Sequence, residues 1–427
     1  MMDSSLLKMP TYDSYTETHI PELGKIPSDW KLKKFKYLSV ISKGVMPKNL
    51  VAESSRGLPV YLSMEYLRGG DAKVYVDDKK ANVLPDNEIL LLWDGSNSGE
   101  FIRSREGVIS STVAHVKFKS IENDYAWFAC SITEKLLRQS TVGMGIPHVD
   151  GGALKNSYLP VPPVEERVQI TRFLSGKVGK VDEAIAIKQK QIELLKERKQ
   201  IIIQQAVTQG LNLGATMKDS GVDWIGEIPE HWGIVRFKNL FTQSRLPVRK
   251  GDGVVTSYRD GQVTLRSNRR VGGYTEAILE GGYQGIRKGQ LVLNSMDAFE
   301  GAIGVSDSDG KCTPEYVICD PINSVNVSQY YFAYLLREMA LAKYIQVICN
   351  AVRQRAVRIR YNNLAPLFMV VPPVKEQEDI VSFIEKESSK LDAGTKHLNE
   401  QISKLKEYKT TLINSAVTGK IKVTELA

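Results

Sequence analysis

The chain has 427 residues, which is more than the roughly 250 to 300 residues at which a single hydrophobic core stops growing, so we expect at least two domains. Its formal net charge of +8 suits a polyanionic partner, such as nucleic acid or an anionic membrane surface, although the same excess also serves solubility in an ordinary protein. The four cysteines show neither the close pairing of a zinc site nor the density of a disulfide scaffold, which indicates buried thiols in a reducing compartment. The chain start has no basic region followed by an apolar run, and no segment reaches the roughly 20 apolar residues that span a bilayer. We therefore expect a soluble, cytoplasmic protein.

Two segments of the chain occur twice. The motif Gly-x-Ile-Pro-x-x-Trp runs from Gly24 to Trp30 and again from Gly226 to Trp232, and Phe-Lys and Leu follow both copies at the same spacing. A longer segment, residues 161–208, aligns without gaps onto residues 371–418. Chance does not produce two such matches, so the chain is predicted to be an internal duplication with a pseudo-twofold axis.

Between the repeats lie two stretches that resemble each other far less, which suggests one scaffold that carries two different inserts. We divide the chain into an N-terminal segment, a first variable domain, a central helix, a linker with the second Gly-x-Ile-Pro-x-x-Trp motif, a second variable domain and a C-terminal helix. These six parts are predicted to cover residues 1–30, 31–160, 161–212, 213–232, 233–370 and 371–427.

Each Pro-Pro pair is followed by apolar residues at alternating steps of three and four, an average period of 3.5 that is typical of a coiled-coil stripe. The predicted packing residues are Val178, Val181, Ile185, Ile192, Leu195 and Ile202 in the first copy, and Leu391, Leu398, Ile402, Leu405 and Leu412 in the second. The other faces are polar, so each helix needs a partner, and an internal twofold would pair the two copies antiparallel. Lys188 and Thr395 interrupt the stripes and would help to fix the register. The alternative is an unrelated pair of amphipathic surface helices.

A helix of roughly 30 residues is about 45 Å long at 1.5 Å per residue. Successive major-groove faces on one side of DNA lie about 34 to 36 Å apart. Two antiparallel helices of this length would therefore hold two inserted domains about one helical turn of DNA apart.

Both inserts are predicted to be α+β domains, with short strands, glycine-rich turns and a closing helical stretch before each Pro-Pro. The closing helices are expected at residues 125–139 and 327–348. Strands are expected at residues 74–76, 88–93, 113–118, 290–294 and 316–319.

Polar loops with the chemistry of DNA contacts follow the central strands, because hydroxyl, amide and guanidinium groups bind base edges and phosphates. The candidates in the first insert are Ser96, Asn97, Ser98, Arg103, Arg105, His148 and Lys155. The candidates in the second insert are Arg259, Arg266, Asn268, Arg269, Arg270, Asn294, Ser295, Arg353, Gln354, Arg355, Arg358 and Arg360. An ordinary polar turn or a solvated charge cluster is the alternative for each of them.

Several enzymatic motifs are absent from the sequence. There is no phosphate-binding loop, no dinucleotide-binding Gly-x-Gly-x-x-Gly after a strand and no metal-binding His-Glu-x-x-His or paired Cys-x-x-Cys. Both Pro-Pro motifs follow valine, not the Asn or Asp with which an amino-methyltransferase holds its target amine. We therefore expect no catalytic residues, no metal and no cofactor in this chain.

The duplicated motifs resemble the specificity subunits of type I restriction-modification systems, and the resemblance covers nearly the whole chain. It rests on Gly24 to Trp30 and Gly226 to Trp232, on the Pro-Pro motifs at Leu159 to Glu166 and Met369 to Glu376, and on the segment Asp219 to Gly226. The resemblance implies that each insert is a target recognition domain that reads one half of a split DNA sequence, while the helices fix the unread spacer.

The same resemblance implies double-stranded DNA and two methyltransferase subunits as partners, the latter docked on the helices with S-adenosylmethionine bound by them. A motor-nuclease subunit that uses ATP and magnesium would join for DNA cleavage and defence against phage. Two other hypotheses stay open: a coiled-coil scaffold whose inserts bind proteins, and a self-contained enzyme.

Overall fold

The computed structural model describes residues 9–52, 57–140, 145–222, 224–269, 282–323, 326–349 and 358–425. The chain divides into two compact units. The first unit holds residues 1–188 and 399–427, and the second holds residues 189–398. Each unit therefore contains one inserted domain and one half of each long helix, and each is described by itself.

The first inserted domain is built on a four-stranded antiparallel sheet with the order β4-β9-β7-β8. Helix α3 packs on this sheet, and a two-stranded ladder of β3 and β10 leads to the long helix. The strands of this unit are β1 (Tyr15–Glu17), β2 (Lys25–Pro27), β3 (Lys31–Lys34), β4 (Ser39–Lys43), β5 (Leu50–Val51), β6 (Tyr75–Val76), β7 (Ile89–Leu92), β8 (Phe101–Arg103), β9 (Val113–Phe118) and β10 (Tyr158–Val161). The short helices are α1 (Phe35–Leu38), α2 (Met64–Leu67), α3 (Asn123–Gln139) and α4 (Gly151–Asn156).

The second inserted domain repeats this arrangement, with the sheet order β14-β21-β18-β19 and helix α6 packed on the sheet. Its strands, with those of the preceding linker, are β11 (Met217–Asp219), β12 (Glu227–Pro229), β13 (Gly233–Arg236), β14 (Phe241–Gln243), β15 (Val255–Ser257), β16 (Val263–Leu265), β17 (Gln284–Ile286), β18 (Leu291–Asn294), β19 (Ile303–Val305), β20 (Gly310–Cys312), β21 (Tyr316–Pro321) and β22 (Phe368–Val371). Its helices are α6 (Gln329–Leu341), α7 (Tyr344–Ile348) and α8 (Tyr361–Leu364). The duplication thus extends to the fold of the inserts, although their sequences have diverged.

Each domain has its own apolar core beside a long helix. In the first unit, Ile170 and Leu174 of the long helix α5 (Val164–Gln209) join the core around Tyr125 of α3. In the second unit, Ile203 and Val207 of the same helix join the core around Tyr331 of α6. The tyrosine hydroxyls are satisfied by backbone carbonyls, because Tyr125 donates to Pro160 at 3.0 Å and Tyr331 donates to Val207 at 2.8 Å.

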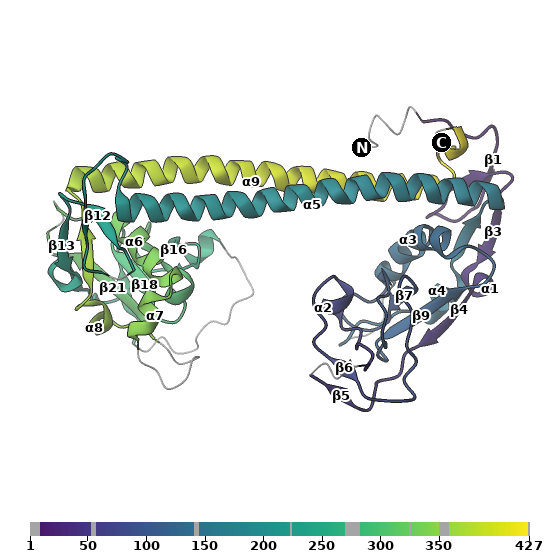
Figure 1. Cartoon of the computed structure of the whole chain (residues 1–427), viewed down its shortest axis with the longest axis horizontal. Helices are drawn as coiled ribbons and strands as arrows, with labels where there is room; N and C mark the ends of the chain where they lie inside the picture. Colours follow the sequence, from purple (N-terminus) through teal and green to yellow (C-terminus); the bar gives the residue numbers. More distant parts are fainter. Residues whose placement is uncertain are drawn as a thin grey trace. The chain divides into compact units, whose positions relative to one another are not determined.

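The two longest helices, α5 and α9 (Val374–Val417), have 46 and 44 residues and are labelled in Figure 1. They are longer than the roughly 30 residues expected, because their end turns also pack on the inserted domains. In the first unit, Asp182 of α5 accepts from Lys409 of α9 at 2.7 Å and Lys188 reaches Gln401. Along α5, the residue number rises from 182 to 188, whereas the number of its partner on α9 falls from 409 to 401. The helices therefore pack antiparallel.

The second unit repeats this contact, because Lys199 of α5 pairs with Asp392 of α9 at 2.7 Å. Lys199 and Asp392 are the repeat equivalents of Lys409 and Asp182, each offset by the same number of residues. The two ion pairs are therefore equivalent contacts of the two repeats, and the expected α+β fold with two antiparallel long helices is confirmed.

Most of the predicted strands and closing helices are confirmed within a few residues, although residues 327–348 form two helices, α6 and α7, not one. The expectation that the thiols are buried is also confirmed. The four cysteines are reduced and buried: Cys130, Cys312, Cys319 and Cys349.

Candidate nucleic-acid interface

The central strand β7 of the first domain ends where a distant segment joins the sheet. At this end, the Trp93 backbone N–H donates to the Thr112 carbonyl at 2.8 Å, and the Val149 N–H donates to the Trp93 carbonyl at 2.9 Å. The side chain of Asp150 then accepts from the first backbone N–H groups of α4, at 2.7 and 3.1 Å. This cap fixes the start of α4, and with it the residues just before the helix.

Four residues lie at this strand end, and we call them the Trp93 cluster: Lys43, Trp93, Asp94 and His148. The Lys43 ammonium lies 3.3 Å from the Asp94 carboxylate and 5.2 Å from the centre of the Trp93 ring. Asp94 and His148 are paired by a backbone bridge, and the His148 side chain is exposed. The cluster therefore presents a cation, a carboxylate, an imidazole and an aromatic ring at the end of the central strand.

The second domain has the same backbone arrangement at the end of β18. The Ser295 N–H donates to the Glu315 carbonyl at 2.9 Å, and the Ile359 N–H donates to the Ser295 carbonyl at 3.1 Å. Because the hydrogen bonds repeat, Ser295 and Glu315 occupy the positions of Trp93 and Thr112 in the first domain. By the same pattern, Arg358 occupies the position of His148.

The side chains at this second position form the Arg358 cluster: Arg245, Glu315, Arg358 and Arg360. They line a polar hollow of about 320 Å³, together with Gln243 and Ser295. The Arg358 Nε donates to a Glu315 carboxylate oxygen at 2.7 Å, and its Nη2 lies 3.5 Å from the Met296 sulfur. Guanidinium groups beside a hollow of this size can reach a phosphate or a base edge.

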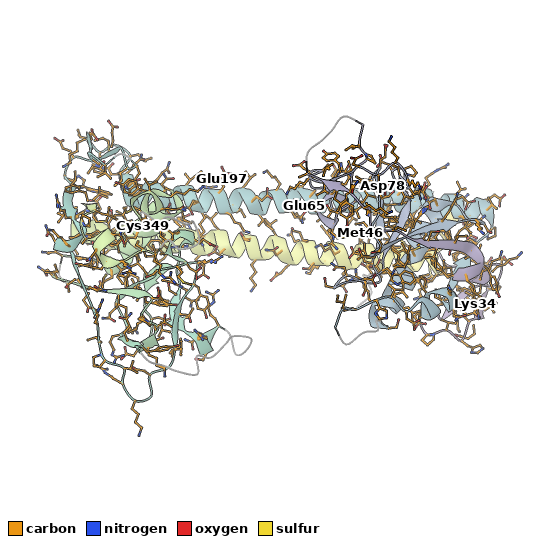
Figure 2. The ribbon with its side chains drawn as sticks, turned by 90° about the horizontal axis from the view of Figure 1, so that it is seen from below. Lys34, Met46, Glu65, Asp78, Glu197 and Cys349 are labelled. Atoms are coloured by element: carbon orange, nitrogen blue, oxygen red, sulfur yellow. The ribbon has the colours of Figure 1, made fainter. Side chains whose placement is uncertain are left out.

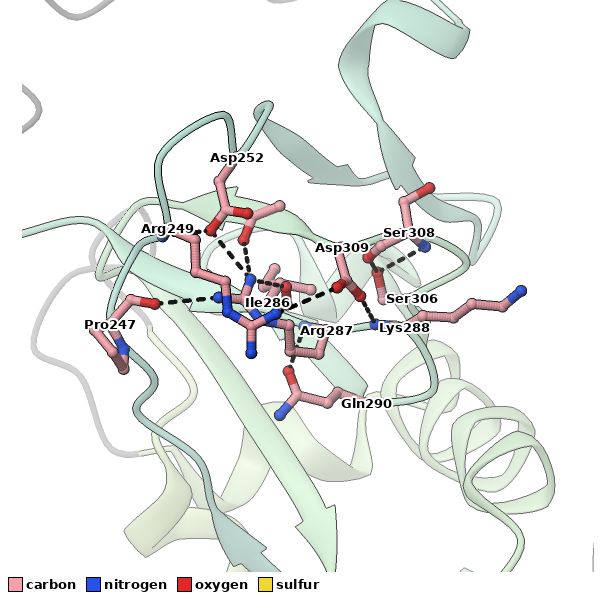
Figure 3. Close-up of polar contacts among 11 residues, drawn as sticks. Pro247, Arg249, Asp252, Ile286, Arg287, Lys288, Gln290, Ser306, Ser308 and Asp309 are labelled. Carbon is pink, nitrogen blue, oxygen red and sulfur yellow. Dashed lines mark hydrogen bonds and ion pairs between the residues drawn. The ribbon is translucent and has the colours of Figure 1, made fainter.

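Arg287 holds the loop that follows Arg245. Its guanidinium donates to the carbonyls of Pro247, Ile286 and Gly310 and to the Asp252 carboxylate at 3.1 Å (Figure 3). Burial acts to raise the pKa of Asp252, but hydrogen bonds from the Arg249 backbone and from Arg287 hold that pKa below its usual value. The loop is thus fixed to the domain at its base.

Gly285 allows this loop to pack closely. A Cβ at this position would lie 2.6 Å from the Pro247 carbonyl oxygen, while the Gly285 N–H donates to the Leu246 carbonyl at 2.8 Å. A side chain here would push the loop, and Arg245 with it, away from the hollow.

A second hollow, of about 470 Å³, opens in the first domain beyond Lys43. Lys48, Lys80 and His115 also line it, and the half-exposed Met46 is labelled in Figure 2. Asp78 lines it as well, but the three lysines outnumber this carboxylate and give the hollow the positive charge that suits a phosphate backbone.

The polar loop predicted in the first domain is a closed turn. Ser96 is exposed, Asn97 is half-buried, and Ser98 is buried with its N–H donating to the Gly95 carbonyl. Lys155 is exposed on the last turn of α4. Ser96 and Lys155 are therefore accessible to a ligand, whereas Ser98 is not.

The two arginines predicted in the first domain hold protein groups. Arg103 donates to Asp124 at 2.8 Å and to the Asn87 carbonyl at 2.7 Å, and its guanidinium stacks over Trp127. Arg105 donates to the carbonyls of Tyr66 and Gly70 and stacks on the Tyr66 ring at 3.8 Å. Both contact sets stabilise the domain.

The arginine-rich segment of the second domain is also engaged within the protein. Arg259 pairs with Asp297 and Glu300, and Arg269 pairs with Asp260 and stacks on Tyr258 at 4.0 Å. Arg266 and Asn268 donate to threonine hydroxyls, those of Thr256 and Thr264 respectively. The predicted residues Arg270, Arg353, Gln354 and Arg355 lie outside the described residues.

The residues predicted at the end of β18 and in the segment paired with it also differ in exposure. Asn294 is half-buried and donates to Asp297 at 3.1 Å, whereas Ser295 is buried and contributes its backbone to the strand end. Arg358 and Arg360 are exposed beside the hollow. Arg259, Asn268 and Arg269 are exposed as well, but they are bound to other protein groups.

Sequence reasoning missed Lys43, Arg245 and Glu315. Each lies at or just beyond the end of a strand, where the register of the central sheet brings it to the cluster. Local sequence holds no signal for this, because the pairing joins segments far apart in the chain.

The predicted helix-packing residues are all buried or half-buried. Val181, Ile185, Ile192, Ile402 and Leu412 are buried, and half-buried positions complete the stripe: Val178, Leu195, Ile202, Leu391, Leu398 and Leu405. Polar side chains such as Glu197, labelled in Figure 2, are exposed on α5.

The described part of the chain holds no group of three or more His, Cys, Asp and Glu side chains arranged for a metal ion. Within the same residues, none of the helices combines the length and apolar character needed to cross a bilayer.

A family model described as the type I restriction modification DNA specificity domain matches residues 27–197. The specificity subunit of the type I restriction enzyme MjaVIII from Methanocaldococcus jannaschii is 36% identical over 231 residues, which is 53% of each chain. The EcoBI specificity subunit from Escherichia coli is 20% identical across 95% of this chain and 89% of its own. Over these ranges, the chain is similar to the specificity subunits of type I restriction-modification systems.

A chain from a solved structure of a type I restriction-modification system has the same fold. It superposes with a TM-score of 0.63 at 14% identity and covers 92% of this chain and 98% of its own. The two chains thus share a fold along almost their whole length. The MjaVIII subunit, by contrast, is matched over only about half of its length.

Proposed function

We propose that the chain is a type I specificity subunit that recognises a bipartite DNA sequence, with each inserted domain reading one half. The observation that carries the proposal is that two domains of one topology present different side chains at equivalent strand ends. The first domain has His148 and Thr112 where the second has Arg358 and Glu315. A repeated fold with unlike reading groups suits two unlike half-sites.

The chain itself is proposed to be non-catalytic and to bind no cofactor. Two methyltransferase subunits, which bind S-adenosylmethionine, would dock on α5 and α9, and a motor-nuclease subunit using ATP and magnesium would join for cleavage. The antiparallel ion pairs of Asp182 with Lys409 and Lys199 with Asp392 support a twofold arrangement of such partners. The cytoplasm, where such a complex meets DNA, is the proposed compartment.

The test is sequencing of modified bases in DNA from cells that express the chain with its methyltransferase partners. We expect methylation at one motif of two fixed half-sites separated by an unread spacer. Methylation without regard to sequence would contradict the proposal. A protein-binding scaffold, the second candidate, predicts that the assembled complex binds random and target DNA equally well.

A further inference from the structure

The guanidinium groups of the second domain differ in how much of their hydrogen-bonding edge is free. Arg259 uses both terminal nitrogens, on Glu300 and Asp297. Arg269 donates from Nη1 to both carboxylate oxygens of Asp260, and its guanidinium stacks on the Tyr258 ring. Arg358 instead binds Glu315 through Nε, and its only other described contact is with the Met296 sulfur, a weak acceptor. Its terminal edge is therefore available to a ligand.

We propose that Arg358 reads a guanine in the half-site of the second domain and that Glu315 is its positioning residue. The proposal rests on the proposed function. An arginine fork donates two parallel hydrogen bonds to O6 and N7 of guanine, the commonest specific contact to a base in the major groove. Glu315 occupies Nε, which leaves the two terminal nitrogens as the pair that makes this fork.

The backbone that follows Arg358 is fixed, as specific reading requires. The Ile359 N–H donates to the Ser295 carbonyl at 3.1 Å, and the Arg360 N–H donates to the Asn363 side chain at 2.9 Å at the start of α8. Ile359 is fully buried. Arg358 therefore projects from a segment anchored to the central strand and to a helix, which limits the entropy lost when it binds a base.

Two more cations share the hollow with Arg358. Arg245 and Arg360 are exposed, line the same hollow and make no ion pair in the part of the chain that the structure describes. Positive groups around a reading residue suit the phosphates that flank a base and hold the duplex in register. The Arg358 cluster thus combines one oriented guanidinium with two free ones.

The first domain supplies the internal control. His148 stands at the position of Arg358 and Thr112 at that of Glu315, so the same backbone site lacks a guanidinium fork. A substitution at Arg358 is therefore expected to change one half-site and leave the other as it is.

The first experiment compares Arg358→Ala and Arg358→Lys with the unchanged chain, each expressed with the methyltransferase partners, by sequencing modified bases genome-wide. One G·C position of one half-site is expected to become degenerate in both variants. Lysine keeps the charge but has no fork, so a phosphate contact would leave the motif intact in Arg358→Lys. Retention of every G·C position in both variants would overturn the inference.

The second experiment measures binding of the assembled complex to duplexes in which 7-deazaguanine, which lacks the N7 acceptor, replaces each guanine of that half-site in turn. The unchanged complex is expected to bind one such duplex about 10- to 100-fold more weakly. Arg358→Ala is expected to show no further loss on it. Equal affinity of the unchanged complex for all the duplexes would refute the guanine contact even if the variants fail to assemble.

Glu315 is tested by rescue. Glu315→Ala should relax the same G·C position, whereas Glu315→Gln keeps an acceptor for Nε and should retain the motif. If the G·C position stays specific in both variants, Glu315 does not position Arg358. If the unchanged complex shows no sequence motif at all, the proposed function fails, whereas an intact motif that ignores Arg358 refutes this inference alone.

Discussion

Glu338 is a buried carboxyl group at the point where the second domain joins the long helix. It lies on α6, is 6% exposed, and accepts a hydrogen bond from Gln200 of α5. Burial raises its pKa to about 7, while the neighbouring Arg337 and the Gln200 hydrogen bond act to lower it. Burial also lowers the pKa of Arg337.

The folded pKa of Glu338 lies above the unfolded one, so the folded state binds the proton more tightly. Between the unfolded pKa of roughly 4.3 and about 7, stability is expected to fall as pH rises, and to level off above this window. Glu338→Gln should remove this slope and raise the unfolding free energy at pH 8 by roughly 2 to 3 kcal/mol. Denaturant unfolding at pH 5, 6, 7 and 8 measures the unfolding free energy of both proteins. The same dependence of that free energy on pH in both would contradict the prediction.

Arg287 offers a test of the loop that carries Arg245. The guanidinium and the Asp252 carboxylate are 13% and 9% exposed, so Arg287→Met should leave a buried charge without its partner and cost about 3 kcal/mol. Arg249→Met is the matched control, since its ion pair with Asp309 is exposed and should contribute less than about 1 kcal/mol. Equal thermal stability of the two variants would show that the Arg287–Asp252 ion pair does not stabilise the loop.

Residue identity alone could not separate reading residues from structural ones. Arg259 and Arg358 both stand in polar segments of the sequence, and both were candidates for DNA contact. The difference lies in tertiary partners: Arg259 faces two carboxylates, whereas Arg358 keeps its terminal edge open. Long-range strand pairing also decides that Arg245 and Glu315 join Arg358, and no local pattern encodes it.

At the scale of elements, the long helices were predictable because their period is local and the repeat doubles the signal. The sequence predicted the stripe from Val178 to Ile202 and the antiparallel pairing. It underestimated the helix lengths, because the end turns pack on the inserted domains. Ile170 and Ile380, both fully buried, lie in those end turns.

Charges in the stripe test the helix packing. Ile192→Asp with Ile402→Asp introduces a carboxylate at two positions that are 8% and 6% exposed, so we expect loss of folded, assembly-competent protein. Glu197→Lys, on the exposed side of α5, is the control and should change unfolding by less than about 0.5 kcal/mol. Circular dichroism melts and size-exclusion chromatography measure both, and a normally assembling double variant would contradict the packing.

At the scale of the whole molecule, we propose that α5 and α9 together set the spacer between the half-sites. Because α5 and α9 pair antiparallel, both helices must be shortened by the same number of residues to keep the ion pairs Asp182–Lys409 and Lys199–Asp392. Removal of residues 186–192 and their repeat equivalents 396–402 would shorten each helix by about 10 Å, close to the rise of three base pairs.

The most direct measurement is sequencing of modified bases in DNA from cells that express either the full chain or this doubly shortened chain, each with the methyltransferase partners. For the full chain we predict one bipartite motif, and for the shortened chain the same two half-sites with a shorter spacer. A motif with an unchanged spacer, or methylation without any motif, would contradict the account.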